Sequence, residues 1–154
     1  MANQKVLHAK DAINGKYGSA YAVIEGSRYE LFHLVDFEAT VDQHKTNIPR
    51  LGAYLDGHKV VGGEGKFTGT MRYMTDVFRK MIHEAIRTKK TVYFDLQITN
   101  DDPDSAAGRH TDVYKYCTLD NQVMSKLDAK NTTLDESIAG TFDDVLSAEQ
   151  FSTI

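Results

Sequence analysis

The segment Gly62-Gly63-Glu64-Gly65-Lys66 contains the glycines and the lysine from which phosphate-binding loops are built. A P-loop also needs a glycine five residues before its Gly-Lys pair and a serine or threonine directly after that pair. Val60 and Phe67 occupy these two positions, and Thr68 stands where a dinucleotide-binding pattern requires its last glycine. The spacing therefore argues against phosphate binding, and the glycines predict tight turns or close backbone approach instead.

The other residue types that perform chemistry are scattered along the chain. The six histidines are well separated in the sequence, so no local spacing of metal ligands exists. The acidic run Asp101-Asp102-Pro103-Asp104 lacks the glycine and the distal glutamate of a calcium-binding loop. Cys117 has no neighbouring histidine to activate it, and no serine lies in a nucleophile-elbow pattern. We therefore predict a protein that is not an enzyme and needs no cofactor, with histidines gathered in space by the fold as an alternative.

Length and composition favour one soluble domain over residues 1–154, because two domains would each be close to the size where a single core becomes marginal. No apolar run is long enough to cross a membrane, and the polar N-terminus does not resemble a signal peptide. A single cysteine favours folding in a reducing cytosol. Residues 1–99 hold 14 Lys/Arg against 11 Asp/Glu, and residues 100–154 hold 4 against 11. The acidic second part argues against a protein that wraps nucleic acid.

Alternation of apolar and polar residues dominates the chain and predicts strands with one buried face. In 92–99, for example, Val92, Phe94 and Leu96 face one way, whereas Tyr93 and Asp95 face the other. Glu25-Gly26-Ser27 is predicted to be a hairpin turn. The predicted strands are 20–24, 29–35, 36–42, 66–73, 92–99, 112–119 and 122–129, with a weaker strand that begins near Thr141.

Only residues 75–88 show the spacing of a helix. The apolar stripe runs from Met74 to Ile86, and Thr75 is placed to cap the first turn. The opposite, polar side of this predicted helix holds Arg79, Lys80, His83, Glu84 and Arg87. One helix among many strands must cover a sheet, so we predict an antiparallel β-barrel or sandwich with one flanking α-helix.

Residues 45–64 are predicted to form a long loop, because they contain four glycines and one proline. They also contain apolar side chains, among them Ile48, Leu51, Tyr54 and Leu55, which a solvated loop does not need. A strand-rich domain must also protect its sheet edges or pair them with another subunit. We therefore expect self-association in which this loop contacts a neighbour and residues 1–15 form an N-terminal arm. A simple dimeric binding module would fit the same observations almost as well.

Over residues 15–150 the sequence resembles the tail-tube (core tail) proteins of PBSX-type contractile prophages and phage-tail-like bacteriocins. The resemblance lies in an ordered series of short motifs rather than in one long match. These are Gly57-His58-Lys59, Gly62, Gly65, Thr68, Thr70, Thr75, Tyr93-Phe94, Leu96-Gln97, Asp102, Ser105, Gly108-Arg109, Leu127-Asp128, Thr141-Phe142 and Asp144.

The resemblance implies a β-barrel-like fold and a structural virion protein made in a bacterial cytoplasm. Such proteins form hexameric rings that stack into a tube inside a contractile sheath, with baseplate and tail terminator proteins as further partners. DNA is only passing cargo, and no membrane binding by the monomer is implied. An acidic lumen would let DNA slide, because like charges repel.

Three sets of residues are the candidate sites under this interpretation. The set for contacts between subunits or stacked rings is Ile48, Leu51, Tyr54, Leu55, Gly57, His58 and Lys59. The set that faces the sheath is Arg79, Lys80, His83 and Arg87. The set that faces the lumen is Asp36, Glu38, Asp42 and Asp95. The competing hypothesis is a small ligand-binding β-barrel, in which the same alternation would line a cavity.

Overall fold

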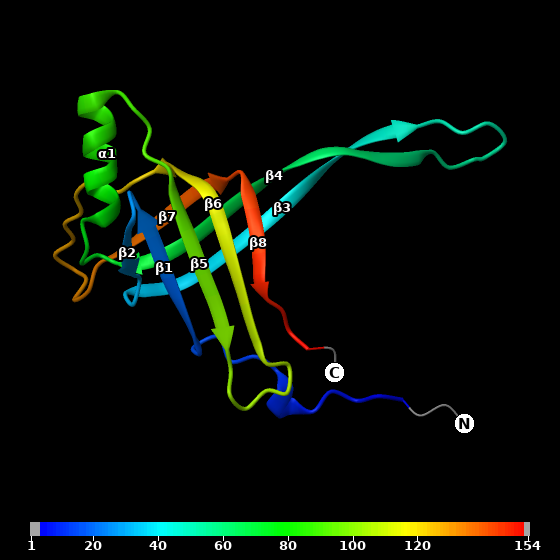
Figure 1. Cartoon of the computed structure of the whole chain (residues 1–154), viewed down its shortest axis with the longest axis horizontal. Coiled ribbons are helices and arrows are strands. Elements are labelled where there is room, and N and C mark those ends of the chain that lie inside the picture. The colour runs from blue at the N-terminus through cyan, green and yellow to red at the C-terminus, as the bar shows by residue number, and fades with distance from the viewer. Residues whose placement is uncertain (1–3, 153–154) are drawn as a thin grey trace.

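The computed structural model describes residues 4–152, which form antiparallel strands and one α-helix (Figure 1). A short 3₁₀ helix, Ala9–Asp11, precedes them. The elements are β1 Gly18–Ile24, β2 Ser27–Glu30, β3 Leu34–Ile48, β4 Gly57–Arg72, α1 Val77–Thr88, β5 Phe94–Asp101, β6 Arg109–Asn121, β7 Asp135–Phe142 and β8 Asp144–Glu149. The predicted fold class, a mainly antiparallel β structure with one flanking helix, is confirmed.

Strand β6 joins two sheets. Its first part pairs with β5 on one side and with β8 on the other, whereas Thr118–Asn121 pair with β7. We call the strands β2-β1-β5-β6-β8 sheet A, and we call β3-β4-β7 with the end of β6 sheet B. Because one strand continues from sheet A into sheet B, the two sheets fold over a shared core as a barrel-like sandwich.

The core lies between the two sheets and beneath α1. The Phe94 ring of sheet A packs against Phe67 of sheet B at 6.3 Å between centroids and against Phe78 of α1 at 5.4 Å. Gly65 and Gly140 make room for aromatic rings, because a β-carbon at either position would overlap the ring of Phe142 or Phe67. The expectation of close backbone approach is confirmed at Gly63, where an added β-carbon would lie 2.8 Å from the Asp42 carbonyl oxygen.

Three predictions of secondary structure were wrong. Residues 29–35 do not form one strand, because β2 ends at Glu30 and β3 begins only at Leu34, after a turn. Residues 122–129 do not form a strand. They belong to a connection, 122–134, in which Leu127 is almost fully exposed, and the chain re-enters the sheets at β7. Residues 45–64 are not a long loop, because β3 and β4 continue through them and Ile48 pairs with Gly57. The turn itself is limited to residues 49–56.

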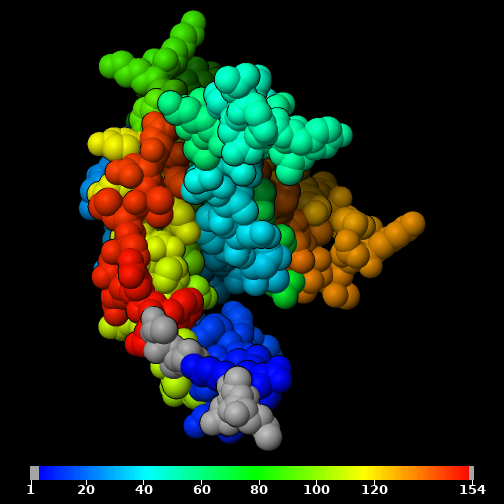
Figure 2. Space-filling model, turned by 90° about the vertical axis from the view of Figure 1, so that its right-hand side faces the viewer, coloured from blue at the N-terminus to red at the C-terminus, as the bar shows by residue number. Residues whose placement is uncertain are grey.

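The N-terminal arm is held against the turn between β5 and β6. The backbone N–H of Asn14 donates to Asp102 Oδ2 at 2.9 Å, and the Asp11 carbonyl accepts from Ser105 Oγ at 2.8 Å. The backbone N–H of Ser152 donates to the Ala107 carbonyl, so residues 11–14 and the segment after β8 both contact this turn (Figures 1 and 2). Residues 1–3 of the predicted arm lie outside the described residues.

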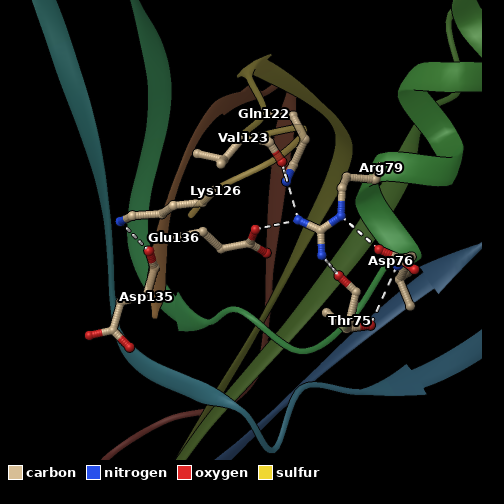
Figure 3. Close-up of polar contacts among 9 residues, drawn as sticks. Thr75, Asp76, Arg79, Gln122, Val123, Lys126, Asp135 and Glu136 are labelled. Carbon is tan, nitrogen blue, oxygen red and sulfur yellow. Dashed lines mark hydrogen bonds and ion pairs between the residues drawn. The ribbon is translucent and has the colours of Figure 1, made fainter. Parts of the chain in front are cut away.

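Arg79 of α1 is buried, although the helical pattern placed it on the polar surface. Its Nη1 donates to Glu136 Oε2 at 2.5 Å, and its Nε donates to Asp76 Oδ1 at 2.7 Å (Figure 3). The same guanidinium donates to the carbonyls of Val123 and Thr75. Arg79 therefore joins α1 to β7 and to the 122–134 connection, and its assignment to a sheath-facing surface was wrong.

The charges around Arg79 compensate one another. Burial acts to lower the pKa of Arg79, but the hydrogen bonds to Asp76 and Glu136 outweigh it, so the pKa is raised. Glu136 is 2% exposed, and its carboxylate depends on Arg79 for charge compensation. His33 lies near this carboxylate, and its Nε2 is buried without a hydrogen-bond partner.

Removal of the carboxylate in Glu136→Ala leaves a buried guanidinium without its main counter-charge. We expect the free energy of unfolding to fall by about 3–5 kcal/mol, the range for breaking a buried ion pair from one side. Replacing both groups, in Arg79→Met/Glu136→Leu, should restore much of the loss because no buried charge remains. Urea unfolding followed by circular dichroism measures all three proteins.

The matched control is the exposed pair of Arg72 and Asp135, whose charged atoms are 2.8 Å apart. Asp135→Ala should lower the free energy of unfolding by about 1 kcal/mol or less, because solvent screens this pair. Equal losses in Glu136→Ala and Asp135→Ala would contradict the role given to Arg79.

Protonation of His33 is expected to destabilise the fold at acidic pH. Burial lowers the pKa of His33 below 6.5, and the nearby Glu136 carboxylate opposes this only in part. Below pH 6.5 the unfolded chain therefore binds the proton more readily than the folded chain, and stability decreases as the pH falls. The slope from this group is at most about 1.4 kcal/mol per pH unit. Unfolding curves at several pH values should show the slope reduced in His33→Gln but unchanged in His83→Gln, a variant of an exposed histidine.

Candidate assembly surfaces

The most prominent surface feature is a two-stranded extension that projects from the body (Figure 1). The pairing of β4 with β7 ends where Gly65 lies opposite Phe142, so residues 57–64 of β4 pair only with β3. At about 3.3 Å per residue these residues extend roughly 26 Å. We call residues 42–64 the projecting hairpin.

The projecting hairpin exposes apolar side chains at its tip. Leu51 and Tyr54 are fully exposed, Leu55 is 69% exposed and Ile48 is 42% exposed. The Arg50 side chain donates to the Leu55 carbonyl at 2.9 Å, and the Ala53 N–H donates to the Arg50 carbonyl, so the turn is held by its own hydrogen bonds. Figure 2 views the molecule from this end, with the turquoise tip toward the reader. An exposed apolar cluster on an ordered element is typical of an interaction surface.

The structure brings the whole predicted set of contact residues into this hairpin. Ile48 lies opposite Gly57, and the next two pairs are Asn47 with His58 and Thr46 with Lys59. Leu51, Tyr54 and Leu55 occupy the turn between the strands. The sequence therefore identified these residues as one exposed segment, although it predicted a loop rather than paired strands.

The outer face of sheet B is polar and rich in carboxylates. Asp36, Glu38 and Asp42 are exposed on one side of β3, whereas Phe37 and Ala39 of the same strand pack against the core. Their partners on β4 are Thr70, Thr68 and Glu64. The Lys66 ammonium lies 3.0 Å from the Glu64 carboxylate, and its hydrogen bond lowers the pKa of Glu64.

Asp95 is not part of this face. It lies in β5 of sheet A, where its carboxylate accepts a hydrogen bond from the Tyr116 N–H at 3.3 Å and lies 3.8 Å from the Lys115 ammonium. The four predicted lumen residues are therefore divided, with three on sheet B and one on sheet A.

The exposed side of α1 carries a net positive charge. Lys80, His83, Glu84 and Arg87 are exposed, and Lys89 and Lys90 follow directly after the helix. Three of the four residues predicted for this surface therefore lie together on it. Arg79 is the exception, because its guanidinium points inward to Glu136.

The strands at the ends of the two sheets in residues 4–152 are β2 and β8 in sheet A and β3 in sheet B, of which β3 is the longest with 15 residues. Residues 57–64 of β4 also have one edge that no described strand covers. Unpaired N–H and C=O groups on such an edge are able to pair with another chain. The sequence did not predict the full length of β3, because apolar and polar residues alternate only where one face of the strand is buried.

Residues 4–152 show few features of a catalytic or metal-binding site. Within residues 4–152 no group of three or more His, Cys, Asp or Glu side chains is placed to hold a metal ion. Cys117 is fully buried, and burial raises the pKa of its thiol to about 12, so the reactive thiolate is scarce at neutral pH. Over the same residues, no helix combines the length and apolar character needed to cross a membrane.

The strand-rich body carries a projecting apolar hairpin and open sheet edges, features typical of a protein that associates with other chains. The family comparison agrees, because the model of the family described as phage tail tube protein matches residues 5–148. The chain belongs to this family.

Two relatives come from Bacillus subtilis (strain 168). The phage-like element PBSX protein XkdM is 29% identical over 146 residues, which cover 95% of this chain and 97% of the relative. The uncharacterized protein YqbM is also 29% identical, over 147 residues that cover 96% and 97% of the two chains. These matches span almost the whole length of both partners.

Two solved structures contain a chain with the same fold. A chain of the anti-feeding prophage baseplate, a sixfold-symmetrised cryo-EM structure, matches with a TM-score of 0.63 at 10% identity and covers 96% of this chain and 97% of the matched chain. A chain from the sheath/tube terminator structure of the extracellular contractile injection system PVC matches with a TM-score of 0.57 at 12% identity, covering 84% and 93%. At such low identity the likeness concerns the fold alone.

Proposed function

We propose that the chain forms hexameric rings that stack into the inner tube of a contractile phage tail or tail-like particle. The tube would be a conduit for DNA or a means of penetrating an envelope. The observation that carries the proposal is the projecting hairpin, which extends beyond sheet B with exposed apolar side chains and has no contact on its own body to bury them. Family membership and the sixfold symmetry of one structure with the same fold support the ring.

Contacts of the hairpin with a neighbouring subunit would bury Ile48, Leu51, Tyr54 and Leu55. Each Å² of apolar surface removed from water contributes about 25 cal/mol before the entropy of association is subtracted. A few such side chains per contact give a modest interaction. Repetition of that interaction around a ring and along a tube gives a stiff assembly, because many linked contacts must break together.

The outer face of sheet B is the surface that we assign to the lumen. A ring closed by sheet pairing through the β3 edge removes that edge and turns one face of sheet B inward. Asp36, Glu38 and Asp42 would then line the channel together with the threonines of β4. Their carboxylates repel phosphates, so DNA would pass without adhering.

The outside of the tube would meet the sheath. The positive face formed by Lys80, His83 and Arg87 lies on α1, an element separate from sheet B, and is free in the monomer. The ends of the tube would meet baseplate and tail terminator proteins. Under this proposal the protein acts inside the tail of a particle that is assembled in the bacterial cytoplasm.

Replacing residues 45–61 by an Asn-Gly turn removes the tip and most of the projecting hairpin. His44 and Gly62 pair in the native register, so a two-residue turn closes the shortened strands. The free energy of unfolding should change by about 1 kcal/mol or less, because the removed residues do not contact the core. Tubes should be absent from negative-stain images of the variant.

The wild-type protein is the control in the same experiment. Light scattering should give rings of about 104 kDa, six times the chain mass of 17.3 kDa, or tubes built from them. Normal tubes from the shortened variant would refute the role of the hairpin. A wild-type chain that stays monomeric even with baseplate and sheath proteins would instead favour a ligand-binding β-barrel.

Charge reversal on α1 should weaken the sheath contact and spare the tube. In Lys80→Glu/Arg87→Glu, we expect several-fold less sheath protein to co-sediment with tubes at low salt, because exposed charges interact most strongly when screening is weak. Glu84→Lys, on the same exposed side of the helix, preserves the positive sign and should retain sheath binding. Unchanged co-sedimentation of the double variant would place the sheath contact elsewhere.

A further inference from the structure

A groove opens at the end of the sandwich opposite the tip of the projecting hairpin. It has a volume of about 350 Å³ and lies between the beginning of β1, the end of β5 and the beginning of β3. Its lining is mixed. The apolar part is Leu31, Phe32, Leu34, Val35, Phe37 and Ile98, and the polar part includes Ser19, Thr99 and Asn100. Phe32 is 74% exposed and Val35 is 48% exposed, so the wall of the groove presents apolar surface to solvent.

The groove and the hairpin tip lie at the two ends of one strand. Strand β3 begins beside the groove at Leu34–Phe37 and ends at Ile48, directly before the turn. From Asp36 to Ile48 the strand extends about 40 Å at about 3.3 Å per residue. Because β3 is paired with β4 over this length, the tip cannot fold back into the groove of its own chain.

The net charges of the two surfaces are complementary. Glu30, Asp36 and Lys16 line the groove, which leaves one net negative charge, and none of the three forms an ion pair within residues 4–152. Arg50, Asp56 and Lys59 lie at the hairpin tip, which leaves one net positive charge, and they too form no ion pair among the described residues. A contact between tip and groove would therefore bury apolar surface and pair opposite charges.

We propose that the groove of one subunit receives the hairpin tip of a second copy, with Leu51 and Tyr54 against Phe32 and Val35 and with Arg50 near Glu30. This inference rests on the proposed assembly and identifies the receiving surface. A contact between two different patches of the same chain repeats head to tail. Such contacts produce closed rings or continuing filaments rather than isolated dimers.

Photo-cross-linking from the tip maps the receiving surface directly. Leu51→benzoylphenylalanine, in the full chain, places a photoreactive ring at a fully exposed position. After assembly and irradiation, mass spectrometry should find the probe joined to the tryptic peptide 29–45 of another chain, which contains Phe32 and Val35. Leu127→benzoylphenylalanine is the matched control, because Leu127 is almost fully exposed but lies in the 122–134 connection.

Cross-links from position 51 to the groove peptide, absent from the control, support the proposal. Normal tubes with cross-links only to other peptides would overturn it and leave the proposed tube function intact. Failure of the wild-type chain to form tubes with its tail partners would contradict the proposed function itself.

A charge exchange decides the question if the probe prevents assembly. Arg50→Glu and Glu30→Arg should each cause loss of tubes, and the double variant should recover them, because the exchange restores opposite charges. A double variant no better than the worse single variant would overturn the pairing. If the single variants assemble normally and a small apolar dye binds the groove of assembled tubes, the groove is a ligand pocket instead.

Discussion

The buried contact between Arg79 and Glu136 is the interaction on which the end of the sandwich depends. Taking a carboxylate out of water is costly unless a counter-charge and hydrogen bonds replace the solvent. Arg79 provides the counter-charge and also binds the carbonyls of Thr75 and Val123. One side chain thus fixes the start of α1, the start of β7 and the connection before β7. With α1 fixed, Phe78 stays against Phe94 and the core is closed.

The core uses only part of the long strands, so the outer part of β4 is free to contact another chain. Strand β4 has 16 residues, but only Gly65–Arg72 pair with β7, so half of the strand contributes to the body and half to the projecting hairpin. The two halves have different chemistry. Phe67 and Met71 of the inner half are buried, whereas Val60 and Val61 of the outer half are exposed. Under the proposed function, stability and association would therefore depend on separate parts of one strand, and the residues of the outer half could vary without damage to the core.

Sequence alone predicted those elements whose pattern reflects a buried face. Residues 92–99 alternate because Phe94 and Leu96 face the core. The same logic failed in 45–64, where solvent lies on both faces and alternation has no physical cause. Arg79 was misassigned because a helical pattern separates apolar from charged residues, whereas the partner that draws this charge inward is 57 residues away. Asp95 was grouped with Asp36 because the polar face of a predicted strand does not reveal which sheet the strand joins.

The geometry of β3 explains why association of this chain is expected to be directional. The groove at one end of this strand and the apolar tip at the other cannot contact each other within one molecule, because β3 is paired with β4 between them. Under the proposed docking, two molecules pair both ends only if the contact is symmetric. Each tip that docks leaves a second tip exposed, so addition of subunits continues until a ring closes or a partner covers the end. A tube that grows by stacking needs this property, and a terminator at its end needs only to cover the last exposed surface.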